Sequence, residues 1–177
     1  MDERHLVNAC LKGDSKAQKQ LYERFAPKMF GVCLRYAKDD DTAQDYLQEG
    51  FIRVFNNLDK FRFEGSFEGW IRRIVVNTAL EKLRKVDVIK NSVEVEKALF
   101  TTDDVEQVMD QINAGELLQL IQTLPTGFRT VFNLYAIEGY THQEIGKMLH
   151  ISEGTSKSQY SRARQWLQLR LNKKEKE

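Results

Sequence analysis

Apolar side chains recur at steps of three and four residues along most of this 177-residue chain. This spacing is the period of one face of an α-helix, and no stretch of the chain alternates apolar and polar residues as a β-strand does. Proline, which breaks helices, occurs only at Pro27 and Pro125. We therefore predict an all-α protein.

Residues 1–85 are expected to form one small domain of four helices. One helix carries an apolar stripe of Leu21, Phe25, Met29, Val32, Cys33 and Tyr36. The acidic run 39–41 offers capping oxygens to a second helix, with Ala43, Tyr46, Leu47, Val54 and Phe55 on its inner face. Residues 58–66 are expected to form a loop, with Ser66 as the cap of a helix that extends to about Lys85. The stripe of this last helix holds Phe67, Trp70, Ile71, Ile74, Val75 and Thr78.

A second four-helix domain is expected over residues 113–177, after an acidic linker over residues 86–112 where the periodicity fades. Its first stripe holds Leu117, Leu118, Ile121 and Leu124 and ends at Pro125, which cannot continue a helix. The next helix carries Phe128, Val131, Phe132 and Tyr135 and ends near Gly139. The architecture predicted is thus two small helical domains joined by an acidic linker.

The net charge of +1 is unevenly distributed along the chain. Residues 1–85 carry a net charge of +3 and residues 117–177 a net charge of +4, whereas residues 86–116 carry −6. Two basic lobes suit a polyanionic partner such as nucleic acid. The acidic stretch between them is typical of a solvated linker.

The C-terminal residues have the pattern of a helix-turn-helix motif. Thr141 and Glu144 are spaced as a capping box, which starts a short helix that ends at Leu149. Ile151 is expected to fill the angle between the helices, and Ser152 to cap the second one. That second helix has an apolar side and a polar, basic side, which favours insertion into a DNA major groove. The alternative is a helical hairpin with an ordinary solvated face.

Three stretches, taken in order, resemble the extracytoplasmic-function group of bacterial RNA polymerase sigma factors. Asp45–Phe55 with Leu58–Arg62 is similar to the region that binds core polymerase, and Ser66–Arg84 to the region that melts the promoter. The second DNA-binding domain of the group is matched by Leu124–Pro125 with Phe128–Arg129, and by Glu138–Thr141 with Glu144–Ile145. The resemblance runs from about Leu6 to Leu171, and only the linker is unmatched. It implies an alternative sigma factor that directs core polymerase to specific promoters and nucleates DNA melting.

The resemblance also implies site residues in each domain. Docking on the clamp helices of polymerase is expected to use Asp45, Gln48, Glu49 and Arg53, which without the resemblance would be an ordinary charged face. The single-stranded −10 element is expected to contact Phe61, Arg62, Phe63, Glu64, Ser66, Arg73, Asn77 and Arg84, with Asn77 in the pocket of a flipped base. The −35 element is expected to contact Thr141, Ser156, Lys157, Ser158, Ser161, Arg162 and Gln165. We expect Trp70 to be a buried core residue and not a wedge between base pairs.

The partners implied are core RNA polymerase through its clamp helices and flap, double- and single-stranded promoter DNA, and an anti-sigma factor. We expect a monomer when free, with no cofactor or metal and no enzymatic activity, because the sequence offers no catalytic set, metal spacing or phosphate loop. No apolar run approaches the ~18 residues of a membrane span and the N-terminus lacks a signal core, so we expect a cytoplasmic bacterial protein. Cys33 is expected to be a buried structural thiol.

Three other classes of function remain open at this point. A two-domain regulator would bind duplex DNA without polymerase, and it would leave Asp45, Gln48 and the loop aromatics without a role. A decoy or anti-sigma module would occupy polymerase or a sigma factor, and it would need neither Asn77 nor the basic helix face. A hydrolase or transferase would need a catalytic set that the sequence does not show.

Overall fold

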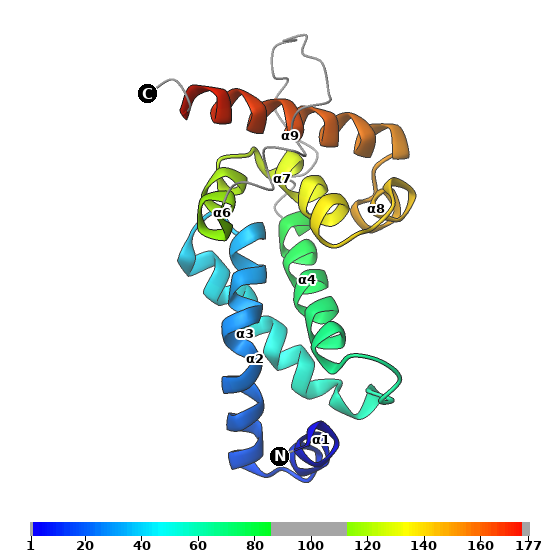
Figure 1. Ribbon diagram of the computed structural model, residues 1–177. Helices are drawn as coiled ribbons and strands as arrows, with labels where there is room; N and C mark the ends of the chain where they lie inside the picture. Colours follow the sequence, from blue (N-terminus) through cyan, green and yellow to red (C-terminus); the bar gives the residue numbers. More distant parts are fainter. Residues whose placement is uncertain (1, 86–112, 175–177) are drawn as a thin grey trace. The chain divides into compact units, whose positions relative to one another are not determined.

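The computed structural model describes residues 2–85 and 113–174, and the regular secondary structure in these ranges is helical (Figure 1). This confirms the predicted all-α class. The chain divides into two compact units between Lys82 and Leu83. The predicted linker, residues 86–112, lies outside the described residues.

The first unit contains helices α1 (Glu3–Leu11), α2 (Ser15–Tyr36) and α3 (Asp40–Asn56), all but the last three residues of α4 (Phe67–Lys85), and a short 3₁₀ turn, η1 (Leu58–Lys60). α3 packs against α2, and α1 packs against α2 and η1. The helix starts are capped as the sequence predicts: the Asp39 carboxylate accepts the Thr42 N–H at 2.8 Å, and Ser66 Oγ accepts the Gly69 N–H at 3.1 Å.

The predicted stripes form the core of the first unit. Leu21, Phe25 and Met29 of α2 are buried together with Ile71 and Val75 of α4. α3 and α4 approach closely at Gly50, where an added Cβ would lie 3.0 Å from Val75 Cγ2. This close contact fixes the position of α4 within the unit.

Both cysteines lie in this first unit and are buried. Cys33 has no exposed surface, and burial raises the pKa of its thiol to about 12. Burial also raises the pKa of Cys10, helped by the nearby Asp14 carboxylate. Cys33 is therefore a structural thiol, as predicted, and Cys10 has the same character.

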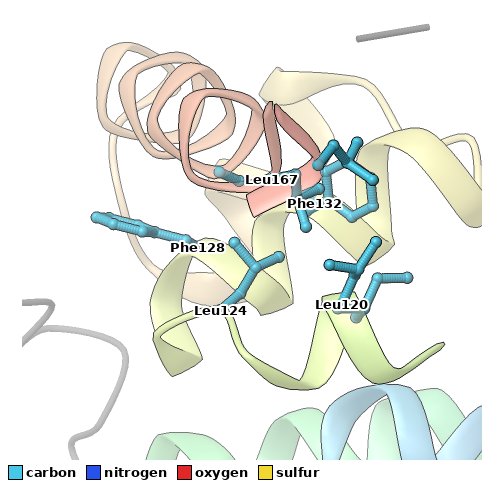
Figure 2. Packing of buried hydrophobic residues seen from close by; sticks show 8 residues of the cluster. Leu120, Leu124, Phe128, Phe132 and Leu167 are labelled. Atoms are coloured by element: carbon cyan, nitrogen blue, oxygen red, sulfur yellow. The ribbon is translucent and has the colours of Figure 1, made fainter. Parts of the chain in front are cut away.

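The second unit contains α6 (Ala114–Gln122), α7 (Thr126–Phe132), a π-helical turn η2 (Asn133–Ile137), α8 (His142–Leu149) and α9 (Glu153–Lys174). Its core forms where α6 and α7 meet α9. Figure 2 shows side chains from these elements converging there, among them Leu120, Leu124, Phe128, Phe132 and Leu167. Most of α9 is thus held by its apolar side, which leaves its other side exposed.

Candidate nucleic-acid and polymerase interfaces

The helix-turn-helix motif has the local geometry that the sequence predicts. Thr141 Oγ1 accepts the Glu144 N–H at 3.2 Å, and the Glu144 carboxylate accepts the Thr141 N–H at 2.8 Å. α8 ends at Leu149 and is capped by His150, whose φ of 56° is left-handed. Ser152 Oγ then accepts the Thr155 N–H at 3.0 Å. The capping box, the turn and the second cap are confirmed.

Gly146 holds the two helices of the motif close together. It is buried in α8, and a Cβ built on it would lie 2.8 Å from the carbonyl oxygen of Ile151. That oxygen belongs to the backbone of the turn, so it cannot rotate away as a side chain can. The role of this glycine could not be predicted from the sequence, because it depends on a contact with the turn and not on the conformation of the glycine itself.

The outward side of α9 is polar and basic. Lys157, Ser158 and Arg162 are exposed, while Ser161 and Gln165 are half-buried. Ala163 and Leu167 are buried on the opposite side. Thr141 is exposed at the start of α8. Apart from Ser156, the residues predicted to contact the −35 element therefore have side chains that solvent reaches.

Ser156 is the exception, and its prediction as a DNA contact is wrong. Its side chain is fully buried, and its hydroxyl lies 2.9 Å from Nδ1 of His142 on α8. A hydroxyl in that position ties α8 to α9 and cannot reach a base edge or a phosphate. The local sequence carries no signal for this, because the partner is 14 residues away.

His142 sits in an aromatic cluster beside this serine. Its ring stacks on Tyr135 at a centroid distance of 4.2 Å and lies 5.8 Å from the ring of Tyr160. Burial and the charge of Lys157 lower the pKa of His142, while Glu153 acts in the opposite direction. The folded protein therefore holds His142 in its neutral form more strongly than the unfolded chain does.

We expect the second unit to lose stability as the pH falls below about 6.5, the usual pKa of an unfolded-state histidine. Below that pH the unfolded chain binds a proton that the folded His142 resists, so acid favours unfolding. Urea unfolding at neutral and acidic pH measures this effect. Between the two pH values, the free energy of unfolding should fall less for His142→Phe, which retains the ring stacking, than for the wild type. An equal loss in both proteins would contradict this assignment.

In the first unit, a cavity of about 340 Å³ opens between the 58–66 loop and α4; we call it the loop pocket. It is lined by Lys60, Phe61, Arg62, Glu64, Ser66, Gly69, Trp70 and Arg73. The structure thus brings together Arg73 and most of the loop residues predicted to bind the −10 element. Phe63 is not part of its lining but packs against Phe61, with ring centroids 4.9 Å apart.

A second cavity of about 310 Å³ lies further along α4; we call it the helix pocket. It is lined by Arg53, Asn57, Lys60, Trp70, Ile74, Asn77 and Thr78. Asn77 therefore lies in a different cavity from the loop residues, whereas the sequence predicted one site for all of them. Arg84 lies in the last turn of α4 and lines neither cavity.

Trp70 borders both pockets. The prediction that it is a buried core residue is only half right, since its side chain is half-buried while Ile71 beside it is fully buried. The ring stacks on Phe67 at 5.9 Å and lies 5.4 Å from Phe61. Phe67 in turn meets Phe25 of α2 edge to face, which fixes the start of α4. Trp70 is thus an anchored ring that lines both cavities.

The predicted polymerase face lies on α3. Asp45 and Gln48 are exposed, and Glu49 is half-buried. Arg53 differs from them, because its guanidinium donates to Glu49 at 3.3 Å and to Glu81 of α4. The hydrogen bond with Glu81 is the main cause of a raised pKa of Arg53. Arg53 therefore joins α3 to α4 and lines the helix pocket, besides flanking the α3 face.

An apolar groove of about 410 Å³ adjoins that face; we call it the α2–α3 groove. Its lining residues are Tyr22, Gln44, Gln48, Phe51, Ile52 and Phe55. Ile52 is 49% exposed and Tyr22 40%, which is high for apolar side chains of this size. The groove could not be predicted from the core stripes, because Tyr22, Phe51 and Ile52 lie off them. Phe55, which was expected on the inner face of its helix, is only half-buried and lines the groove.

Within residues 2–85 and 113–174, no three histidine, cysteine or acidic side chains are grouped so that they could hold a metal ion. In the same ranges no helix combines the length and the apolar character needed to cross a membrane.

Comparison with known proteins decides the family. A family model described as sigma-70 region 2 matches residues 21–88, and one described as sigma-70 region 4 matches residues 114–167. The RNA polymerase sigma-H factor of Pseudomonas aeruginosa is 30% identical over 175 residues, which cover 92% of this chain and 90% of the relative. The chain belongs to the extracytoplasmic-function (ECF) group of RNA polymerase sigma factors.

Two further comparisons agree with this ECF sigma factor assignment. The ECF sigma-E factor of Escherichia coli is 31% identical over 171 residues, covering 90% of this chain and 89% of the relative. The fold is shared with the sigma factor RpoE in its complex with the anti-sigma factor NepR from Bartonella quintana, with a TM-score of 0.52 at 20% identity over 87% of this chain and 96% of that one. As an alternative sigma factor, the protein directs RNA polymerase to promoters in transcription initiation. The region 2 match contains both pockets of the first unit, and the region 4 match contains most of the helix-turn-helix motif.

Proposed function

We propose that this ECF sigma factor captures unstacked bases of the non-template −10 strand in the loop and helix pockets and reads the −35 element with α9. The observation that carries the proposal is the pair of pockets on either side of Trp70. Capture of unstacked bases by the first unit nucleates melting of the promoter.

The side chains around the pockets supply what a single strand needs. Phe61 and Trp70 offer apolar faces on which bases stack, and Asn77 offers both a donor and an acceptor for a base edge. Arg62 and Arg73 add positive charge for the phosphates, and both are exposed. Two pockets that share one tryptophan wall suit two successive bases better than one.

The second unit suits duplex DNA. A capped recognition helix with Lys157 and Arg162 exposed on its outer side has the features by which such helices enter a major groove. The small side chains of Ser158 and Ser161 permit close approach to the bases. With Ser156 buried, the proposed contact set is Thr141, Lys157, Ser158, Ser161, Arg162 and Gln165.

For polymerase, we propose docking of the clamp helices on Asp45, Gln48 and Glu49, next to the α2–α3 groove. An apolar groove beside exposed polar groups has the composition of a protein interface, with an apolar centre and a polar rim. Arg53 supports this face by fixing Glu49. The second unit rests on the flap in this proposal, and an anti-sigma factor, as in the RpoE complex, regulates access to these surfaces in the cytoplasm.

Two measurements on the purified chain test the proposal against its rivals. The chain should bind core RNA polymerase in a pull-down, whereas a regulator that binds duplex DNA alone would not. It should also support run-off transcription from a promoter with core enzyme, which a decoy or an anti-sigma module would not do. Failure to bind core polymerase would refute the sigma mechanism.

Replacing Asn77 by alanine is expected to weaken open-complex formation by about 1–2 kcal/mol, because a base loses one polar partner. Asn77 is exposed, so its removal should leave folding and polymerase binding unchanged. Heparin-resistant complexes measure the effect. Normal yields of these complexes with Asn77→Ala would show that the helix pocket binds no base.

Replacing Arg162 by alanine is expected to weaken binding of the upstream element by about 1–2 kcal/mol, with the loss confined to sequences that carry the recognised base. Binding titrations on the upstream duplex and on scrambled duplexes measure this. The same loss on every duplex would reassign Arg162 to a phosphate contact.

A further inference from the structure

The tip of the 58–66 loop has an unusual backbone. Phe63 has a φ of 58° and Gly65 a φ of 120°, both in the left-handed region. Glycine adopts that region easily, but a residue as bulky as phenylalanine rarely does, because its Cβ crowds the backbone. Such a conformation persists only where surrounding contacts hold it.

Arg4 of α1 provides such a contact. Its guanidinium carbon lies 4.9 Å from the centroid of the Phe63 ring, which is the arrangement of a cation–π interaction. α1 is itself held firmly, because Leu6, Val7 and Cys10 are buried in the core and Glu3 pairs with Arg24 of α2 at 3.4 Å. Arg4 thus reaches the loop from a fixed support.

The Phe63 ring is connected to the loop pocket through a chain of ring contacts. It lies 4.9 Å from Phe61, and Phe61 lies 4.8 Å from Phe67 and 5.4 Å from Trp70. Phe61 and Trp70 line the loop pocket, while Phe63 does not. A change in the position of Phe63 would therefore move a wall of the pocket without removing any group that touches the strand.

We propose that Arg4 is a positioning residue that holds Phe63 in its left-handed conformation and thereby sets the base preference of the loop pocket. The proposal rests on the proposed function, since it assumes that the loop pocket binds a base. α1 precedes the residues matched by the region 2 family model, which begin at residue 21. Arg4 would thus be a specificity determinant that lies outside the matched region.

Another role for Arg4 is a direct contact with a DNA phosphate, since its side chain is exposed. The two roles differ in one respect. A phosphate contact works regardless of residue 63, whereas a positioning contact needs the aromatic ring. Phe63→Leu keeps an apolar side chain but removes the ring, so it separates the two roles.

The experiment uses holoenzyme reconstituted from bacterial core polymerase and the full chain, with a pool of short single-stranded DNA of randomised sequence as the probe. Bound strands are sequenced, and the affinity for the sequence that the wild type enriches most is then measured. The proteins compared are wild type, Arg4→Ala, Arg4→Lys, Phe63→Leu and the double variant Arg4→Ala with Phe63→Leu. Lys12→Ala is the matched control, because Lys12 is an exposed cation directly after α1 for which no ring contact is found within residues 2–85 and 113–174.

We expect Arg4→Ala to reduce the preference for the enriched base by about two- to fivefold, the range of an exposed cation–π contact, with a smaller loss for Arg4→Lys. In the Phe63→Leu background, Arg4→Ala should have no further effect, and Lys12→Ala should match the wild type. In the free chain, with Trp166 replaced by phenylalanine so that Trp70 is the remaining tryptophan, the emission of Trp70 should shift in Arg4→Ala but not in Lys12→Ala.

Two results would overturn the proposal. One is an unchanged base preference in Arg4→Ala. The other is a loss of affinity on replacing Arg4 by alanine that is as large in the Phe63→Leu background as in the wild type. The second result would identify Arg4 as a phosphate contact. If wild-type holoenzyme enriches no sequence at all, the proposed capture of bases fails, and the role of Arg4 fails with it.

Discussion

Gly146→Ala is expected to lower the free energy of unfolding of the second unit by about 3 kcal/mol, which is at the upper end of the usual cost of overpacking a core. The added methyl group would lie 2.8 Å from the Ile151 carbonyl oxygen, which is part of the turn between α8 and α9. The turn must open to admit it, and opening changes the angle at which α9 is presented. Binding of the upstream duplex should therefore be lost even in the molecules that remain folded.

Gly154→Ala is the matched control for this substitution. A Cβ at that position in α9 would meet only the Ser152 hydroxyl, at an ordinary 3.8 Å. Alanine favours a helix over glycine by up to about 1 kcal/mol, so this variant should be as stable as the wild type or more so. Urea unfolding and duplex titrations measure both variants. If Gly146→Ala proves as stable as Gly154→Ala, the two helices are not in the close contact described.

Trp70→Ala is expected to weaken binding of the single-stranded −10 element by about 3 kcal/mol, on the order of a hundredfold. Stacking on an aromatic side chain contributes about 1–3 kcal/mol per base, and Trp70 borders two pockets. The loss should therefore exceed that of Asn77→Ala, which affects one pocket only. Trp70→Phe should recover a large part of it, because a flat aromatic face remains.

The controls for Trp70→Ala separate stacking from folding. Trp166→Ala removes the same type of side chain from the second unit, where Trp166 donates to Thr123 at 3.4 Å, and it should leave binding of the single strand unchanged. Thermal unfolding shows how much of the Trp70→Ala protein is folded under the assay conditions. Wild-type affinity in folded Trp70→Ala protein would mean that neither pocket uses this ring.

Local chemistry made much of the fold predictable. Capping by Asp39, Ser66 and Ser152 and the box of Thr141 with Glu144 depend on residues only three positions apart, so the sequence contains the whole interaction. The apolar stripes of α2 and α4 follow in the same way from helical periodicity, since most of their members are buried.

Contacts between distant segments were not predictable from periodicity. Ser156 and Gln165 both carry small or polar side chains on the same helix, but only Ser156 is turned towards His142 and away from solvent. The resemblance to the ECF sigma factors placed Arg53 on the polymerase-binding face, yet Arg53 also pairs with Glu81 from another helix. The separation of Asn77 from the loop pocket likewise depends on where the 58–66 loop folds over α4.

The two buried thiols have a practical consequence for studies of this sigma factor. A thiol reagent reacts with the thiolate, and Cys33 in the folded first unit, with a pKa of about 12 and no exposed surface, presents almost none. Modification of Cys33 must therefore wait for the helices around it to separate. The labelling rate, followed by mass spectrometry, measures how often the first unit opens under native conditions. The same burial makes Cys33 a poor direct sensor of oxidants.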